Sequence, residues 1–286
     1  FQEIQEHTVS GIYSEECGWN TWHGYTVMAI DGSKTQLPND PALLEAFGGT
    51  GAGAKAPTAQ ASFLYDPLND IIVDAKLAPL STDERTLAKE HLMALSRLTS
   101  IKKKLILFDH GYPSSDLIAA LQASHCDFLL RVRSKFSIAL DALDMGVHPF
   151  DFPCDDGNTI PLVAVKLTLD IGETEMLQTS IQDKRMGAKA FKELYFARWG
   201  VEVRINDLKH KVEIENFLGR LENNLYHAFP RNSFLSEYEA LWIGAKKEPN
   251  LTSISFKSPK RVMSNEIQTT FFPSRLYLHT ALYLEK

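Results

Sequence analysis

The sequence lacks most of the features that mark thiolate, zinc or membrane proteins. Its three cysteines in 286 residues are far apart and form no C-x-x-C pair, so we expect reduced thiols and a cytoplasmic setting. None of its nine histidines has the spacing of a zinc-ligand pair, which argues against a zinc site. No apolar run is long enough to span a membrane and no secretory signal is present, so we expect no membrane partner.

A basic excess is also missing. The net charge is −6 and the pI about 5.9, which argues against a protein that coats nucleic acid but leaves room for local contacts. Residues 184–211 carry eight lysines and arginines against three acids, a composition that suits a phosphate-facing patch. With 44% hydrophobic and 23% charged residues, the chain has the composition of one large globular domain, or of one domain with an insertion.

The spacing of apolar residues predicts strands that alternate with helices. A loop is expected over 32–58, and 134–181 is less regular, with strand-like stretches that indicate a β-rich insertion. This order of elements predicts an α/β fold with a mixed sheet. Strands are expected at 25–31, 60–65, 70–77, 104–109, 127–132, 159–169 and 173–180, and helices at 82–98, capped by Ser81 or Thr82, at 114–123, capped by Ser114, and at 187–217.

One face of the expected helix 187–217 carries an unusual set of polar side chains. At about 100° per residue, Tyr195, Arg198, Glu202 and Lys209 share a narrow stripe. A solvated face with intrahelical ion pairs is the ordinary explanation of such a stripe. A neighbouring apolar stripe is expected to pack on a sheet and to hold the polar one at the edge of the core. The apolar stripe comprises Leu194, Val201, Ile205, Leu208 and Val212, and Trp199 is also expected in the core.

Two aspartates end apolar strands and enter glycine-containing turns. Asp31 begins the turn DGS and Asp109 begins the turn DHGY. Each alone is explained as a turn residue, but acids at the ends of neighbouring strands can meet at one sheet edge. Together with Glu202 they offer oxygen ligands of the kind that Mg²⁺ or Mn²⁺ prefers, and two such ions can drive phosphodiester cleavage. The acids of the hairpin are expected at its turn and surface: Asp66, Asp70 and Asp74.

These motifs resemble those of bacterial insertion-sequence DDE transposases of the IS-four family, the group with a Y-x2-R-x3-E-x6-K signature. The residues Tyr195, Arg198, Glu202 and Lys209 match that spacing without a gap. DGSKTQLP and DHGYPS match the first and second acidic motifs of the family, and the resemblance covers about residues 24–219.

The resemblance implies an RNase H-like mixed sheet flanked by helices, with a β-rich insertion before the last catalytic helix. It divides the chain into a first part of the catalytic core, the insertion, the final helix of the core and a divergent tail: 24–133, 134–181, 182–219 and 220–286. It implies that Asp31, Asp109 and Glu202 are catalytic and hold two Mg²⁺ or Mn²⁺ ions.

The resemblance also implies an activity and partners. The activity is cut-and-paste transposition, with metal-dependent cleavage and strand transfer at transposon ends in the bacterial nucleoid. The partner is double-stranded DNA, bound sequence-specifically at transposon ends and at the target, and the protein is expected to be a homodimer on DNA. Arg198 and Lys209 would contact phosphates, and Tyr195 would place the terminal nucleotides.

Two departures from the family pattern keep alternatives open. The chain begins at Phe1 with about 30 residues before the first motif, so we expect a fragment without the N-terminal DNA-binding portion. Residues 220–286 leave the family pattern, which indicates a frameshifted or degenerate tail. An RNase H-like nuclease without strand transfer, and an inactive truncated relic that only binds DNA, are the alternatives. A P-loop is disfavoured, because Ala54 precedes Lys55 and Ala56 follows it.

Overall fold

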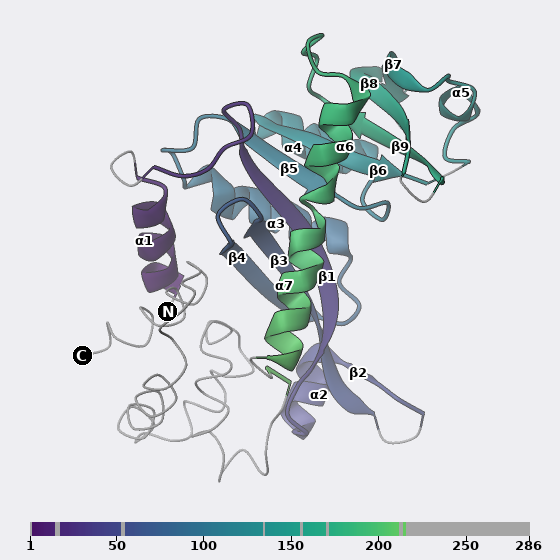
Figure 1. Ribbon diagram of the computed structural model, residues 1–286. Helices are drawn as coiled ribbons and strands as arrows, with labels where there is room; N and C mark the ends of the chain where they lie inside the picture. The colour runs from purple at the N-terminus through teal and green to yellow at the C-terminus, as the bar shows by residue number, and fades with distance from the viewer. Residues whose placement is uncertain are drawn as a thin grey trace.

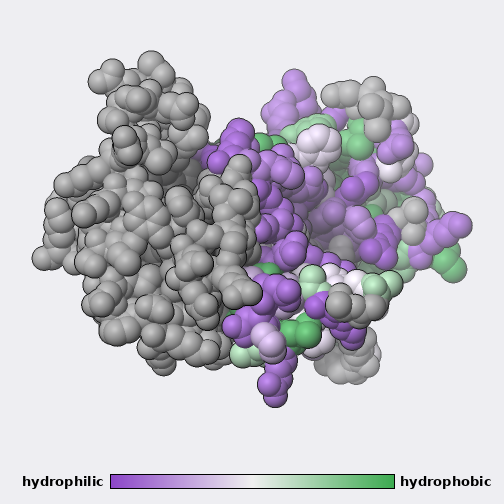
Figure 2. Space-filling model, turned by 90° about the horizontal axis from the view of Figure 1, so that it is seen from below, coloured by the Kyte–Doolittle hydropathy of each residue, from purple (hydrophilic) through white to green (hydrophobic). Residues whose placement is uncertain are grey.

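A mixed β-sheet forms the centre of the computed structural model, and helices pack on both of its faces (Figure 1). Hydrophilic side chains cover much of the described part of the face seen in Figure 2, with smaller hydrophobic groups between them. The structure describes residues 2–14, 18–52, 55–133, 135–154, 157–169, 172–211 and 214–215.

Five strands form the first half of the sheet. β1 (Thr26–Gln36) pairs antiparallel with β3 (Ala56–Asp66), which pairs antiparallel with β4 (Ile71–Pro79). On its other side β1 pairs parallel with β5 (Lys104–Phe108), and β5 pairs parallel with β6 (Cys126–Val132). Three antiparallel strands followed by two parallel ones, in the order β4-β3-β1-β5-β6, are the RNase H-like arrangement, so the fold class predicted from the sequence is confirmed.

The sheet continues beyond β6 with three antiparallel strands that precede the last helices. β9 (Thr174–Thr179) pairs with β6, β8 (Thr159–Thr168) pairs with β9, and β7 (Gly146–Pro153) pairs with β8. The short helix α5 (Ile138–Asp141) connects β6 to β7. At the opposite end of the sheet, β2 (Gly49–Thr50) pairs with β3.

The helices on the two faces come from different parts of the chain. α3 (Glu84–Ser96) and α4 (Ser115–Ala123) pack on one face, against β3, β4 and β6. α6 (Ala188–Phe196) and α7 (Trp199–His210) cross the other face, where α7 contacts β1 and β3 (Figure 1). Because both faces are covered, the middle strands read as continuous apolar runs. Within the described part of the chain, no helix is long and apolar enough to cross a bilayer. The remaining helices are α1 (Gln2–Ile12) and α2 (Pro41–Phe47).

The prediction of a loop over 32–58 is wrong. β1 continues to Gln36 because β3 pairs with it along its full outer length, from Ala29 opposite Tyr65 to Gln36 opposite Thr58. The second half of β1, Gly-Ser-Lys-Thr-Gln, is polar, so the spacing of apolar residues does not identify it as a strand. Pro41 begins α2, whose N-cap Asp40 accepts a hydrogen bond from the Ala42 amide.

The prediction of a single long helix over 187–217 is also wrong, because the structure has two helices there. α6 ends at Phe196 and α7 begins at Trp199, with a tight turn between them that is held by i→i−3 hydrogen bonds. Just after the turn, Gly200 lies against β3: an added Cβ would stand 3.1 Å from atoms of both Tyr65 and Pro67. α7 ends at His210, while Val212 and the tail 220–286 lie outside the described residues.

Burial of the polar stripe and of its neighbours differs in part from expectation. Leu194, Val201, Ile205 and Leu208 are buried as predicted. Trp199, expected in the core, is 57% exposed and meets Phe196 edge-on, because the turn rotates it away from the sheet.

The three hairpin acids are not surface residues. Asp66 is fully buried and accepts a hydrogen bond from the Tyr13 hydroxyl at 2.7 Å. Asp74 is buried against His91 at 2.8 Å, and Asp70 contacts Tyr65 and Arg204. The capping of helices was predicted in part: Ser114 caps α4, but Asp83 rather than Ser81 or Thr82 precedes α3.

Candidate active site

Strand register places the two motif aspartates beside each other. β1 and β5 run parallel with Ala29 opposite Leu107, so Asp31 and Asp109 each stand two residues further along their strands. β5 ends at Phe108, and beyond that point β1 has a neighbour only on its β3 side. The two carboxylates therefore reach an edge where the sheet opens.

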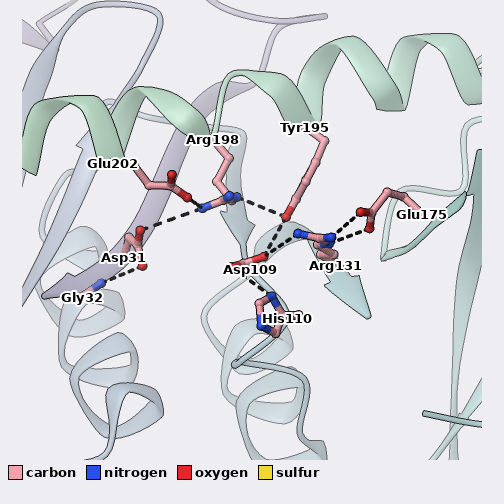
Figure 3. Close-up of polar contacts among 9 residues, drawn as sticks. All are labelled: Asp31, Gly32, Asp109, His110, Arg131, Glu175, Tyr195, Arg198 and Glu202. Atoms are coloured by element: carbon pink, nitrogen blue, oxygen red, sulfur yellow. Dashed lines mark hydrogen bonds and ion pairs between the residues drawn. The ribbon is translucent and has the colours of Figure 1, made fainter. Parts of the chain in front are cut away.

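The third acid of the motif comes from the helix that crosses this edge. Glu202 lies in the first turn of α7, four residues after Arg198 in the turn between the helices. The Arg198 Nη1 atom is 2.7 Å from Glu202 Oε1 and 3.9 Å from Asp31 Oδ2. Arg198 is only 2% exposed, so its charge is taken out of water and must be balanced by these carboxylates. Figure 3 shows the guanidinium between the acids.

A chain of polar contacts continues from Arg198 to the second aspartate. Arg198 Nε donates to the Tyr195 hydroxyl at 3.1 Å, and that hydroxyl donates to Asp109 Oδ1 at 3.1 Å. The second oxygen of Asp109 is 3.0 Å from His110 Nδ1, and Arg131 approaches the first oxygen at 3.7 Å. Arg131 is itself paired with Glu175 of β9 (Figure 3). The structure thus joins Asp31, Asp109, Tyr195, Arg198 and Glu202 in one network.

Lys209 stands apart from this network. Its Nζ donates to the carbonyl of Lys34 at 2.6 Å and lies 3.2 Å from Glu215. It therefore ties the end of α7 to the outer part of β1, about two turns from Glu202. Among the described residues, Lys209 contacts Lys34 and Glu215 and not the acids that surround Arg198.

The two aspartates have opposite pKa shifts. Burial raises the pKa of Asp31 to about 6, although its hydrogen bond from the Gly32 amide and the charge of Arg198 act against this rise. Burial also raises the pKa of Asp109, but the His110 amide, Arg198 and the His110 ring more than offset it, so this pKa lies below its usual value. Two neighbouring carboxyls with diverging pKa values are typical of a functional site.

The donor set fits hard divalent cations. The acids that converge here are all carboxylates, which are ligands that suit Mg²⁺ or Mn²⁺. In the part of the chain that the structure describes, no three acid, histidine or cysteine side chains already stand close enough to hold a metal, and Arg198 contacts Asp31 and Glu202 instead. Burial raises the pKa of Asp31 even though Arg198 lies 3.9 Å away, and a bound cation would offset this cost of burying the carboxylate.

Sequence reasoning missed three residues that the structure brings to this site. Arg131 and Glu175 belong to β6 and β9, and an arginine inside the apolar run DFLLRV was the available signal for the first. Glu84, the first residue of α3, looked like an ordinary acid at a helix start and gave no separate signal.

Comparison with known proteins identifies the family. Residues 22–229 match the sequence profile of the family described as the transposase DDE domain, which is well over half of the chain. The chain belongs to this family. The prediction of a DDE transposase is therefore confirmed at the level of the family.

The DDE transposase domain has curated and structural relatives. "Putative transposase InsZ" of Escherichia coli (strain K12) is 26% identical over 129 residues, which are 44% of this chain and 42% of the relative. The match thus spans less than half of that relative's length. A piggyBac transposase synaptic complex with hairpin DNA covers 90% of this chain and 56% of the piggyBac chain, at 15% identity and a TM-score of 0.44. A pre-cleavage Mos1 transpososome covers 44% of this chain and 41% of its own, at 12% identity and a TM-score of 0.26.

Proposed function

We propose that this DDE transposase domain cleaves double-stranded DNA at transposon ends and transfers the cleaved strand to target DNA. The observation that carries the proposal is one network of contacts: Asp31 and Glu202 meet at the buried Arg198 guanidinium, and Asp109 joins them through the Tyr195 hydroxyl. Acids from three distant segments that meet at an open sheet edge are the arrangement that metal-dependent phosphodiester chemistry needs.

We propose that these three acids hold two Mg²⁺ or Mn²⁺ ions. Such ions would activate the attacking oxygen and stabilise the leaving one. The side chains themselves set the conditions for binding. Asp31 is deprotonated only above about pH 6, so its carboxylate becomes available for a cation near neutral pH. The Glu202 side chain is 49% exposed, which leaves it room to turn between Arg198 and a cation.

We propose that Tyr195, Arg198 and Lys209 face the DNA. Arg198 and Tyr195 already contact Asp31 and Asp109. A DNA phosphate bound by these two side chains would therefore lie beside the acids that act on the scissile bond. Lys209 would add a contact further along α7, within the basic segment 184–211. Recognition of transposon ends, target capture and a homodimer on DNA are also part of the proposal.

We also keep the placement in the IS-four family and the division of the chain as proposals. The uninterrupted Y-x2-R-x3-E-x6-K spacing supports the placement. The position of β7, β8 and β9 between β6 and α6 supports a β-rich insertion at 134–181, between a core at 24–133 and a final part at 182–219.

A plasmid assay tests the cleavage step. Supercoiled plasmid is incubated with the chain and Mg²⁺ or Mn²⁺, and nicking is followed on a gel. Nicking should need the metal and should be lost in Glu202→Gln but kept in Glu193→Gln, an exposed acid of α6.

Supplying a cleaved end with a free 3′-hydroxyl then tests strand transfer: joined products support a transposase, and cleavage without joining indicates a nuclease. A chain that binds DNA but never cuts it would be an inactive relic.

A further inference from the structure

A fourth acid approaches the motif aspartates from the opposite face of the sheet. Glu84 begins α3, and its carboxylate lies beside the glycine that follows Asp31: an added Cβ at Gly32 would stand 2.9 Å from Glu84 Oε1. An added Cβ at Gly111, two residues after Asp109, would stand 3.9 Å from Glu84 Oε2. One carboxylate group therefore lies between the two motif turns, and a side chain at Gly32 would displace it.

The open edge of the sheet explains how this acid reaches the site. Gly32 is opposite Ser62 in the pairing of β1 with β3, and Ser62 contacts α3, so Gly32 has its α-hydrogens toward α3 and Asp31 points to the other face. β5 ends at Phe108 and no longer separates the two faces beyond that point. A group on the α3 side can therefore approach the same edge as Asp31.

Two polar links hold α3 in the position that this requires. Gln60 Nε2 donates to Glu84 Oε1 at 3.2 Å. Two residues along β3, the Ser62 hydroxyl is 3.0 Å from Nε2 of the fully buried His91, whose Nδ1 is 2.8 Å from Asp74. Glu84 and His91 are seven residues apart, about two helical turns, and so lie on the same face of α3. The contact with Gln60 thus places the Glu84 carboxylate against β3, near the turn that follows Asp31.

A buried hydroxyl beside the acids gives an independent indication of a ligand. Tyr112 is 1% exposed, and its hydroxyl has no hydrogen-bond partner among the described residues. Tyr112 follows Gly111, at which an added Cβ would stand 3.9 Å from Glu84 Oε2, and the charges of Glu84, Asp31 and Asp109 add to burial in raising the pKa of the phenol. A buried polar group without a partner calls for a bound water or ion at that position.

We propose that Glu84 is a further ligand of the divalent-cation site at Asp31 and Asp109. Its carboxylate binds the cation either directly or through a water that also contacts the Tyr112 hydroxyl. This rests on the proposed function, since it requires that the motif acids bind a divalent cation. Asp31 and Asp109 supply ligands from the strands and Glu84 supplies one from a helix held rigidly against β3.

Binding of Mn²⁺ to the whole chain, followed by the electron paramagnetic resonance signal of free Mn²⁺, tests the proposal without DNA cleavage. Glu84→Gln keeps an oxygen for Gln60 but loses the charge, and it should weaken Mn²⁺ binding about tenfold or more. Glu90→Gln is the matched control, a half-buried acid of the same helix about 240° around its axis, and should bind as the parent chain does. Asp31→Asn should lose binding.

The outcomes separate the two proposals. If Asp31→Asn loses Mn²⁺ but Glu84→Gln binds it as the parent chain does, Glu84 is no ligand and the proposed function stands. If Asp31→Asn also binds normally, the cation site at the motif acids fails, and the role of Glu84 fails with it. Thermal unfolding without metal shows whether each variant is folded. Should Glu84→Gln be unfolded, Glu84→Asp replaces it: weakened binding supports the proposal, and parental affinity overturns it.

Discussion

The two faces of the sheet carry polar clusters that are similar in composition but different in burial. On the α3 face, His91 contacts Ser62 through one ring nitrogen and Asp74 through the other. All three are buried, and both histidine nitrogens are used. A serine, a histidine and an aspartate in this order resemble a nucleophilic triad, but a fully buried serine cannot meet a substrate. This cluster joins helix to sheet.

On the α7 face, the cluster around Arg198 is neither closed nor balanced. Glu202 is half-exposed, and Asp31 has a pKa raised to about 6. The guanidinium is almost fully buried, and its contacts with acids range from 2.7 to 3.9 Å. The two clusters contain similar residue types, but every polar group of the His91 cluster is paired and buried, whereas the Arg198 cluster has a half-exposed acid and an acid with a raised pKa. This difference in pairing, rather than residue type, is what marks the Arg198 cluster as the candidate for chemistry.

Breaking the structural cluster should have the largest effect on stability. His91→Ala leaves Asp74 buried without its main partner and opens a cavity under α3, which should cost about 3–5 kcal/mol of unfolding free energy. Met93→Ala, at a 62% exposed position of the same helix, is the control and should cost little. Urea unfolding followed by circular dichroism measures both. Equal stability of the two variants would show that the His91 cluster does not hold α3.

Breaking the reactive cluster should change activity rather than stability. Glu202→Gln should lower metal-dependent plasmid nicking about a hundredfold or more, because a metal-bound carboxylate supports several kcal/mol of transition-state stabilisation. Its unfolding free energy should fall by no more than about 1 kcal/mol, because Gln keeps an oxygen for the buried Arg198 guanidinium and Glu202 is half-exposed. Glu193→Gln should leave both unchanged. A large loss of stability in Glu202→Gln would place Glu202 among structural residues.

The pH dependence of stability should reveal the uncompensated carboxyl. The pKa of Asp31 is raised from 3.8 to about 6, so the folded chain binds this proton more tightly than the unfolded chain. Its stabilising contribution is therefore present at acid pH and is lost as the pH rises through about 6. Asp31→Asn should be more stable than the parent by about 1–3 kcal/mol near pH 8, and the gain should disappear near pH 4. Urea unfolding at both pH values measures it, and a gain of the same size at both would contradict the raised pKa.

A methyl group added at Gly32, between the two faces, should have a small effect on stability and a measurable one on Mn²⁺ binding. In Gly32→Ala the new Cβ meets the Ala61 carbonyl at 3.3 Å and two side-chain ends, Gln60 Nε2 at 2.8 Å and Glu84 Oε1 at 2.9 Å. Their displacement should cost about 1 kcal/mol and weaken Mn²⁺ binding. Gly187→Ala, where an added Cβ meets nothing within 4 Å, should leave Mn²⁺ affinity unchanged. Normal Mn²⁺ binding in Gly32→Ala would separate Glu84 from the cation.

Local patterns foretold the parts of this structure that depend on local causes. The apolar run 104–109 predicted β5, and helical spacing predicted the buried side of α7, including Val201 and Leu208. Asp31 and Asp109 each end an apolar strand, and from this came the expectation that they can meet at one sheet edge. The roles of these site residues remain predictions until they are measured.

The remaining features depend on contacts between distant residues. The turn at Arg198 follows from the close approach of Gly200 to Tyr65, which no spacing within 187–217 reveals. Asp66 is buried because it accepts a hydrogen bond from Tyr13, 53 residues earlier. The position of Glu84 depends on the packing of α3 against β3. In the sequence alone, nothing distinguishes Glu84 from the other acids.

The central claim is that three distant segments share one site for divalent cations. Loading the chain with Fe²⁺ in place of Mg²⁺ and adding ascorbate and peroxide cuts the backbone close to the bound metal, and mass spectrometry locates the cuts. We predict cuts near Asp31, Asp109 and Glu202, suppressed by excess Mg²⁺ and absent in Asp31→Asn. Cuts confined to one segment, or cuts elsewhere that Mg²⁺ does not suppress, would contradict a shared site.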